Sequence, residues 1–477
     1  MDKKVGLKVG LEIHQQLNTH KLFCNCPSEL RDDSPDIRVE RYLHAVAGET
    51  GKVDVAADYE QARKRKFIYE AYSDSTCLVE LDESPPIELN KDALFTALQI
   101  SLLLNAKPLP AIQIMRKTVI NGSNTSGFQR TVLIATDGHV KTRHGKVGIA
   151  TIVLEEDAAR IIKKEKDQVT YRLDRLGIPL IEIATDPDIK SAEQAREVAA
   201  KLGEILRATN VKRGIGTIRQ DVNLSIRKGV RVEVKGVQDL RLISKIIEKE
   251  VERQLGLLKK KRKVKEEVRK ALPDGRTEFL RPLPGGARMY PETDLPIIHI
   301  TSEMLEHVKD KLPRLREEEQ ADLEKLGIHT EIASQIVREN LLQLFNQLLK
   351  TKVNPNLIAK TLTVITKNIA AHHKVSTSRL TRNSYEAVLE AFYKDMITKD
   401  AIEEVLTEIV KGQEAKKAIS KFKALSKSEV GKIIKTILKK QPKLKENQKA
   451  LMGVAMKQLR GKADGKLIAE VVGKAVK

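Results

Sequence analysis

Acidic side chains interrupt several apolar, strand-like segments in the first half of the chain. Glu12 and His14 lie two residues apart in VGLEIH, and Glu182 lies within GIPLIEIATDPD. The run GIATIVLEED ends with Glu155, Glu156 and Asp157. A carboxylate among apolar neighbours is costly to bury unless it pairs with a cation. Several carboxylates on one sheet face would repel one another, and a divalent ion such as Mg²⁺, which phosphoryl transfer requires, would remove that repulsion.

Structural ion pairs are the alternative explanation for these acids. Arg160, Arg172 and Arg219 are available as partners, and ion pairs within sheets are common, so spacing alone favours ion pairs over a metal site. A single histidine such as His14 is also more often a hydrogen-bonded structural residue than a metal ligand. Spacing therefore leaves both interpretations open.

The cysteines give only a weak indication of a metal site. Cys24 and Cys26 form a CxC pair, and Cys77 is the third and last thiol. A structural zinc site needs about four ligands, and a second cysteine pair is missing, so zinc is not expected. Three cysteines in 477 residues indicate a reducing compartment rather than a disulfide-linked fold.

Two segments rich in glycine and polar residues are candidate binding loops. Residues 121–138 (NGSNTSGFQRTVLIATDG) combine backbone N–H groups with the hydroxyls of Ser123, Thr125 and Ser126, which could bind phosphate, although composition alone favours an ordinary surface hairpin. Residues 283–296 (LPGGARMYPETDLP) are either a binding loop or the exit from a domain. The sequence contains no P-loop or dinucleotide fingerprint, so any nucleotide chemistry needs another fold.

Strands and helices of the first 296 residues must position these groups. Alternation of apolar and polar residues predicts strands over residues 5–14, 219–227 and 231–235. The second of these strands would carry Arg219, Asp221 and Asn223 on its polar face. Helices are expected over residues 91–105, 191–210 and 239–271. The last includes KKKRKVKEEVRK, for which a solvated helix face is the favoured interpretation and a nucleic-acid-binding patch the alternative.

Composition divides the chain near residues 295–300, where a mixed pattern of strands and helices gives way to helices alone. The fold class is therefore α+β. We expect domains at 1–296, 297–373, 374–410 and 411–477, of which the 374–410 segment is a helical linker and the last is rich in lysine. The net charge of +21 fits a polyanionic partner or a highly charged soluble surface about equally well.

The sequence also bears on the location of the protein. The start, MDKKVGLKVG, lacks an apolar run of signal-peptide length. The sequence has no stretch of the roughly 20 apolar residues that a membrane-spanning helix needs. A cytoplasmic protein without membrane contact is expected.

Several long segments, in order, resemble one family, the B-type and E-type subunits of tRNA-dependent amidotransferases (GatB/GatE). They are VGLEIHQQLNTHKLFCNCPSELRDD, VLEEDAARII, DRLGIPLIEIATDPDI, IRQDVNLSIR and VEVKGVQDLRLI, and GVAMKQLRGKADGKLIAEVV resembles the family's mobile tail. The strings INGSNTSGFQRT, LPDGRTEFL and RPLPGGARMYPETDLP are closer to the archaeal E type. That type normally carries an inserted domain similar to part of aspartyl-tRNA synthetase before Leu283, and this sequence leaves no room for it.

The resemblance implies a sheet-based catalytic cradle over residues 1–296, a helical domain and a YqeY-like tail that binds tRNA. It implies a carbon–nitrogen ligase in which ATP, with Mg²⁺, phosphorylates the glutamate of Glu-tRNA(Gln) and ammonia displaces the phosphate. By motif, the catalytic and metal-binding residues would be Glu12, His14, Glu156 and Glu182. Residues nearby or in contact with substrate would be Glu155, Asp157, Arg219, Asp221, Asn223, Ser123, Thr125 and Ser126.

The resemblance also implies partners. They would be tRNA(Gln) charged with glutamate and an asparaginase-like D-type amidase (GatD) that releases ammonia from glutamine. Two alternatives remain open at this point. One is a B-type protein that works with A-type and C-type partners (GatA and GatC) and also accepts aspartyl-tRNA; the other is a non-catalytic tRNA-binding protein.

Overall fold

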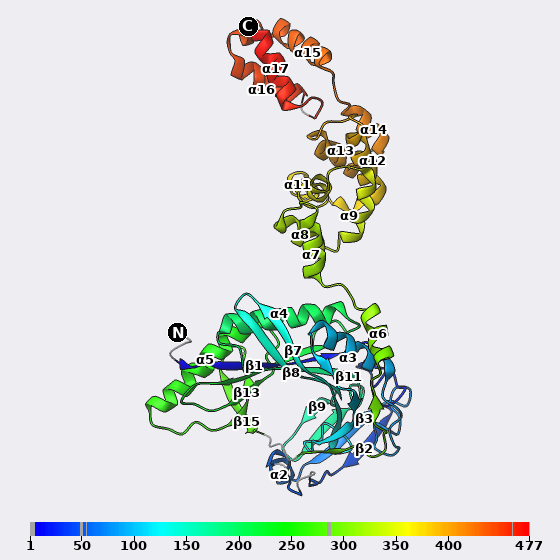
Figure 1. The fold of residues 1–477 in the computed structure, drawn as a ribbon, viewed down its shortest axis with the longest axis vertical. Coiled ribbons are helices and arrows are strands. Elements are labelled where there is room, and N and C mark those ends of the chain that lie inside the picture. The colour runs from blue at the N-terminus through cyan, green and yellow to red at the C-terminus, as the bar shows by residue number, and fades with distance from the viewer. Residues whose placement is uncertain (1–4, 48–50, 54, 284–287, 460, 477) are drawn as a thin grey trace. The chain divides into compact units, whose positions relative to one another are not determined.

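The computed structural model describes residues 5–47, 51–53, 55–283, 288–459 and 461–476. The chain forms two compact units, Met1–Pro313 and Arg314–Lys477 (Figure 1). The first unit holds the sheets, and the second is helical, so the α+β class is confirmed. Within the described part of the chain, none of the helices is long and apolar enough to cross a membrane.

An eleven-stranded sheet forms the body of the first unit. Its order is β15-β14-β13-β12-β1-β11-β8-β7-β6-β16, with β4 paired to β7, and only β13 and β14 run parallel. The strands are β1 (Lys8–Gln16), β4 (Lys107–Pro108), β6 (Ile114–Thr118), β7 (Phe128–Thr142), β8 (Gly145–Glu156), β11 (Pro179–Thr185), β12 (Ile218–Ser225), β13 (Val232–Lys235), β14 (Glu267–Ala271), β15 (Thr277–Pro282) and β16 (Met289–Pro291).

Three helices cover the apolar face of this sheet: α3 (Lys91–Leu103), α4 (Ala192–Ala208) and α5 (Leu240–Lys259). In β1, the alternate residues Val9, Leu11 and Ile13 are fully buried against this layer. Glu12 and His14 therefore point to the opposite, polar face. The side chain of Ser191 caps α4 by accepting a hydrogen bond from the N–H of Gln194, as expected for the start of that helix.

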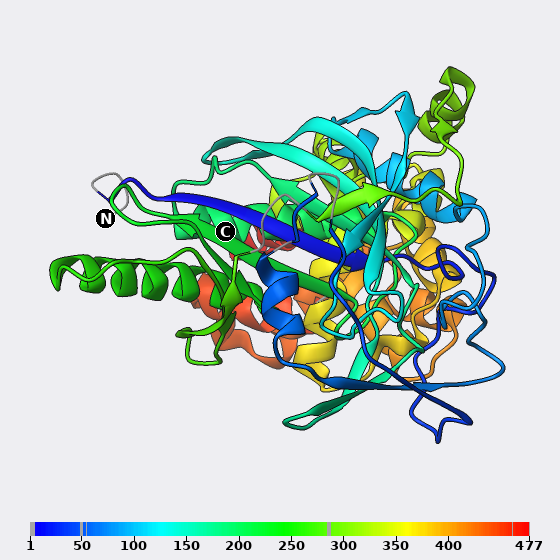
Figure 2. The same cartoon turned by 90° about the horizontal axis from the view of Figure 1, so that it is seen from below.

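A smaller sheet lies on the other side of the large sheet from α4 (Figures 1 and 2). Its order is β2-β3-β10-β9, formed by β2 (Ile37–Arg41), β3 (Lys66–Ala71), β10 (Gln168–Arg172) and β9 (Arg160–Lys164). Phe67, Tyr69 and Tyr171 pack in its core. In the described residues of the unit, the other elements are α2 (Val55–Gln61), α6 (Ser302–Asp310) and the short pair β5 (Ala111–Ile112) and β17 (Ile298–His299).

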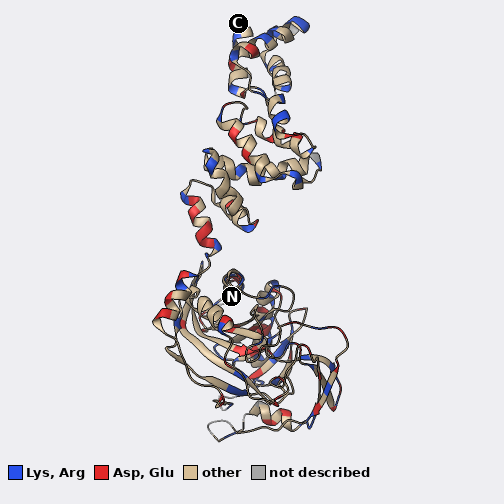
Figure 3. Cartoon of the chain, turned by 90° about the vertical axis from the view of Figure 1, so that its right-hand side faces the viewer, with Lys and Arg blue, Asp and Glu red and all other residues tan. Residues whose placement is uncertain are grey.

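The second unit has two separate hydrophobic cores. One runs from Leu323 to Ala418 and the other from Val430 to Val472. The first core belongs to α7 (Arg316–Lys325), α8 (Thr330–Arg338), α9 (Leu342–Leu348), η1 (Leu349–Thr351), α10 (Pro355–Lys360), η2 (Thr361–Ile365), α11 (Thr366–His373), η3 (Thr377–Arg379), α12 (Arg382–Tyr393), α13 (Ala401–Val410) and α14 (Ala415–Lys421). The second belongs to α15 (Lys427–Lys440), η4 (Pro442–Glu446), α16 (Gln448–Leu459) and α17 (Gly465–Val476). Lysine and arginine are frequent near the C-terminus (Figure 3). The domain boundaries at 296, 373 and 410 stay predictions.

Residues 121–138 belong to a hairpin, as composition favoured, because β6 and β7 pair antiparallel and β7 begins at Phe128. The hairpin is not a surface one, since β7 buries Val132 and Ile134. Another prediction of local structure is wrong. The charged helix expected to reach residue 271 ends at Lys259. Lys261 adopts a left-handed conformation with φ +53°, the N–H groups of Lys261 and Arg262 donate to the carbonyls of Leu258 and Leu257, and the chain then enters β14. This hydrogen-bond pattern ends helices.

Candidate active site

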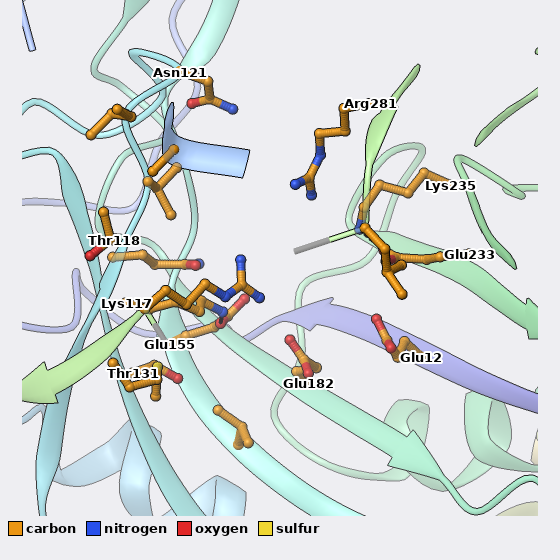
Figure 4. A pocket seen from close by; sticks show the side chains of 18 of the residues that line it. Glu12, Lys117, Thr118, Asn121, Thr131, Glu155, Glu182, Glu233, Lys235 and Arg281 are labelled. Atoms are coloured by element: carbon orange, nitrogen blue, oxygen red, sulfur yellow. Dashed lines mark hydrogen bonds and ion pairs between the residues drawn. The ribbon is translucent and has the colours of Figure 1, made fainter. Parts of the chain in front are cut away.

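A cavity of about 550 Å³ opens on the polar face of the large sheet. Its lining includes His14 and, as Figure 4 shows, Glu12, Glu155 and Glu182. Strand pairing places these side chains together. His14 lies opposite Glu182 of β11 and Arg219 of β12, and Glu12 lies opposite Asp221. The central position of β1 thus brings residues that are about two hundred positions apart in the sequence onto one surface.

The first group of possible ligands is His14, Glu155 and Glu182, whose ligand atoms lie within 4.8 Å of one another. His14 Nε2 is 3.1 Å from Glu182 Oε2. Burial is the largest effect and opposes a charge on the imidazole, but the hydrogen bond to Glu182 together with the negative charges of Glu182, Glu155 and Asp221 raises the pKa of His14. Burial is also the largest effect on Glu182, but the same hydrogen bond together with the positive charges of Lys117, His14 and Lys235 lowers the pKa of that carboxyl. The ammonium of Lys117 donates to Glu155 Oε2 at 2.6 Å.

The second group is Glu12, Asp221 and Glu233, whose ligand atoms also lie within 4.8 Å of one another. Burial, followed by the charges of Glu182 and Glu233, raises the pKa of Glu12. Asn223 Nδ2 donates to Glu12 Oε1 at 2.8 Å. Lys235 Nζ lies 2.8 Å from Asp221 and 2.6 Å from Glu233. Burial opposes the charge of Lys235, but these two carboxylates outweigh it and raise its pKa.

Glu156 and Asp157 do not line this cavity. Adjacent residues of a strand point to opposite faces, so Glu155 faces the cavity and Glu156 faces away. Glu156 Oε2 accepts the backbone N–H of Arg130 at 3.2 Å, and burial raises the pKa of its carboxyl. Asp157 accepts hydrogen bonds from Gln16 Nε2 at 2.7 Å and from the guanidinium of Arg219 at 2.8 Å. The structure therefore brings Glu12, His14 and Glu182 together with Glu155 rather than with Glu156.

The hydroxyls of the 121–127 loop donate hydrogen bonds to other groups of the protein. Thr125 Oγ1 donates to the carbonyl of Glu80, Ser126 Oγ to the carbonyl of Phe128, and Ser123 Oγ to the side chain of Asn124. Asn121 lines the cavity in their place. From the 283–296 segment, Leu283, Arg288 and Met289 line the cavity, and its residues 284–287 lie outside the described chain.

Sequence reasoning missed Lys117, Glu233 and Lys235 as site residues. A signal for the last two was present, because Arg231, Glu233 and Lys235 alternate with Val232 and Val234. Charged residues at every second position of a strand share one face. Arg231 and Arg281 also line the cavity, so cationic groups surround the acids.

The cysteines form a second cluster of possible ligands. Cys24, Cys26, Cys77 and Glu80 place one ligand atom each within 4.8 Å of one another. The hydrogen bond from Cys24 lowers the pKa of Cys26 to about 7, and burial raises the pKa of Cys77 to about 11. The sequence offered no fourth ligand to join the three cysteines, and the structure places Glu80 there. The carboxylate of Glu80 is also 2.6 Å from the buried ammonium of Lys21.

Comparison with known proteins extends over the whole chain. The family model of the GatB/GatE catalytic domain matches residues 7–306, and that of a GatB domain matches residues 343–476. The chain is similar to archaeal proteins named as the E-type component of glutamyl-tRNA(Gln) amidotransferase. It is 40% identical to the one from Methanocaldococcus jannaschii over 624 positions, covering 100% of this chain and 99% of the relative. For the one from Thermococcus gammatolerans the identity is 36% over 620 positions, covering 99% and 98%. Because these alignments exceed the 477 residues of the chain, the relatives contain a long segment without a counterpart here.

Proposed function

The chain belongs to the GatB/GatE family of tRNA-dependent amidotransferases, and we propose that it is the E-type component (GatE) that converts Glu-tRNA(Gln) into Gln-tRNA(Gln) with ATP and ammonia. The observation that carries this proposal is the cavity on the polar sheet face, in which Glu12, Glu155 and Glu182 converge beside cationic side chains. The resemblance of the chain to GatE relatives over its whole length favours this type over the B type.

The reaction has two steps. The γ-phosphoryl group of ATP first passes to the side-chain carboxylate of the glutamate esterified to tRNA, which leaves ADP and an acyl phosphate. Ammonia then attacks the acyl carbon, inorganic phosphate leaves with the former carboxylate oxygen, and the nitrogen loses a proton. Phosphorylation is needed because a free carboxylate is a poor electrophile, and catalysis consists of positioning and charge stabilisation.

The acids of the cavity fit a hard divalent cation. Mg²⁺ prefers carboxylate oxygens and keeps several waters, and Glu12, Glu155 and Glu182 present such oxygens to one space. The raised pKa of Glu12 supports this fit, because burial and neighbouring carboxylates disfavour its charge when no cation is bound. When bound, Mg²⁺ would neutralise charge on the phosphoryl oxygens. His14 would orient Glu182 through its hydrogen bond.

Two ammonium groups stand on opposite sides of the acids in Figure 4. Lys117 approaches from β6 and Lys235 from β13. Both are held by carboxylates of the site, Lys117 by Glu155 and Lys235 by Asp221 and Glu233. In the proposed reaction they face the phosphoryl oxygens and stabilise the negative charge that the transfer spreads over them.

The ammonia would come from a partner. The resemblance to the E-type proteins implies an asparaginase-like amidase that would release the ammonia from glutamine. The helical second unit, whose C-terminal helices are rich in lysine, would hold the body of the tRNA.

Amide formation by the purified protein tests the proposal. The assay contains Glu-tRNA(Gln), ATP, Mg²⁺ and ammonium chloride, so that no partner is needed. We expect Gln-tRNA(Gln), with one ADP formed per amide. Glu182→Gln should lower the rate by about 100-fold or more while tRNA affinity is retained, and Glu306→Gln, which changes an exposed glutamate of α6, is the matched control. Equal loss of tRNA binding in Glu182→Gln, or no amide from the unmodified protein, would contradict the proposal.

A further inference from the structure

The residues KKKRKVK at positions 259–265, which lead from the end of α5 towards β14, form a basic loop that the catalytic site does not use. Six of the seven are lysine or arginine, and all six are exposed. The seventh, Val264, is only 5% exposed and anchors the loop to the domain. Figure 2 shows α5 extending to the outer tip of the domain, where this loop begins.

The positive charge of the basic loop is not compensated. The preceding helix differs, because Lys249 pairs with Glu252 and Arg253 with Glu250. For the six cations of the loop, the structure shows no ion pair with any carboxylate in the described part of the chain. Cations at the end of a helix do interact favourably with its last carbonyl groups, but that effect reaches only the final turn and does not account for six charges.

The backbone of the loop adds a second observation. Lys261 stands in the left-handed conformation, at φ +53°, directly after the helix end. Glycine is the residue that usually occupies this position, because a side chain disfavours that conformation. Lys64, Lys352 and Lys374 adopt the same conformation, so this position explains how α5 ends, and the exposed side chain of Lys261 is left pointing into solvent.

The position of the loop relative to the cavity indicates which partner its positive charges would meet. β14 begins two residues after Lys265, and its residue Val268 pairs with Arg281, which lines the cavity. At about 3.3 Å per residue, Lys265 lies within about 10 Å of Val268 along the strand. Arg231, which also lines the cavity, directly precedes β13, whose first residue pairs with the first residue of β14. The basic loop therefore joins the sheet at the end of β13 and β14 where Arg231 and Arg281 line the cavity.

We propose that the basic loop binds the sugar–phosphate backbone of tRNA beside the 3′ end that enters the cavity; this inference rests on the proposed function. A closely spaced series of cations matches the closely spaced phosphates of a nucleic acid and gains affinity by releasing counterions. The loop contains no aromatic residue, so it contacts the backbone rather than stacking on bases.

A triple variant that removes charge without threatening the fold tests the loop. It combines Lys260→Ser, Lys261→Gly and Lys263→Ser, and the glycine relieves the left-handed position. The matched control is Lys163→Ser, Lys164→Ser and Lys166→Ser, which removes three charges at the end of the smaller sheet. Binding of Glu-tRNA(Gln) is measured over a range of salt concentrations. Melting of both variants is compared with that of the unmodified protein.

We expect the loop variant to bind tRNA at least about tenfold more weakly, with the slope of log K against log salt reduced by about 2 to 3. The control should change affinity by less than about twofold. A charge-reversing variant, Lys263→Glu, should weaken binding on its own. Unchanged affinity and slope in the loop variant would overturn the inference. The inference would also be overturned if the loop variant bound tRNA normally but no longer bound the amidase partner, because the loop would then contact a protein.

Amide formation by the unmodified protein, measured on the same preparation, separates this inference from the proposed function. If the unmodified protein makes no Gln-tRNA(Gln), the proposed function fails. If it makes the product and the loop variant binds tRNA as well as the unmodified protein, only the assignment of the loop fails.

Discussion

Replacing Glu12 with glutamine should stabilise the metal-free protein and abolish its activity. The carboxylate of Glu12 is disfavoured in the folded state by burial and by Glu182 and Glu233, which raise its pKa. Glutamine has nearly the same shape, and its amide oxygen can still accept the hydrogen bond from Asn223. The substitution therefore removes the repulsion and keeps the packing.

The size of the effect follows from the distances. The ligand atoms of Glu12, Asp221 and Glu233 lie within 4.8 Å of one another. Two unit charges at that distance repel by about 3 kcal/mol at an effective dielectric constant of about 20. Lys235, which contacts Asp221 and Glu233, offsets most of this. We expect a net gain of about 1 to 2 kcal/mol for Glu12→Gln, or a rise of about 1.5 to 3 °C in the melting temperature of the first unit, which spans Met1–Pro313.

The gain should depend on pH with a defined sign. A group whose pKa is raised in the folded state destabilises that state at pH values above the folded pKa. The advantage of Glu12→Gln is therefore complete at pH values above the raised pKa of Glu12, declines as the pH falls through that pKa, and is absent below the ordinary pKa of glutamate.

Magnesium should reverse the order of stability. A ligand that binds only the folded state at 100 times its Kd stabilises that state by about 2.7 kcal/mol, and the variant lacks one of the proposed ligands. Thermal melting with and without Mg²⁺, with Glu306→Gln as the control, measures both effects. The reasoning would be refuted if Glu12→Gln melted at a lower temperature than the unmodified protein without Mg²⁺. It would also be refuted if Mg²⁺ raised the melting temperatures of the variant and the unmodified protein equally.

Three further predictions follow from the same geometry. Lys235→Met should destabilise the first unit by about 2 to 3 kcal/mol in denaturant unfolding, because Asp221 and Glu233 lose their shared cation; unchanged stability would show that they do not depend on it. Glu155→Gln should lower kcat by about 100-fold or more and Glu156→Gln by less than about tenfold, because only Glu155 faces the cavity; the reverse order would contradict the assignment. Truncation after Ala424 should remove only the second core of the helical unit, weaken tRNA binding and reduce its salt dependence, and full affinity of the truncated chain would exclude a tRNA contact there.

Alternation along single strands could be predicted from the sequence. The pattern of Val9, Leu11 and Ile13 correctly placed Glu12 and His14 on one face, and the caps and apolar spacing located α3 and α4. These features depend only on residues within a few positions of one another. The polar faces of β12 and β13 were visible in the same way.

Pairing between distant strands could not be predicted from spacing. The register His14–Glu182 and the neighbourhood of Glu12, Asp221 and Glu233 depend on β1 lying between β11 and β12. The choice between the adjacent acids Glu155 and Glu156 depends on the register of β8 against β11. The approach of Glu80 to the three cysteines likewise depends on tertiary packing. The end of α5 at Lys259 was missed because lysines that favour a helix are followed by Lys261 in a left-handed turn.

The central place of the first strand has a consequence for biosynthesis. β1 leaves the ribosome well before its neighbours β11 and β12, which follow only at Pro179–Thr185 and Ile218–Ser225. At a translation rate of about 5 to 20 residues per second, β1 waits roughly 10 to 40 seconds for both partners. During that time its apolar face and its unpaired backbone edges are open to other chains. The nascent protein should therefore depend on chaperones until the second partner strand has emerged.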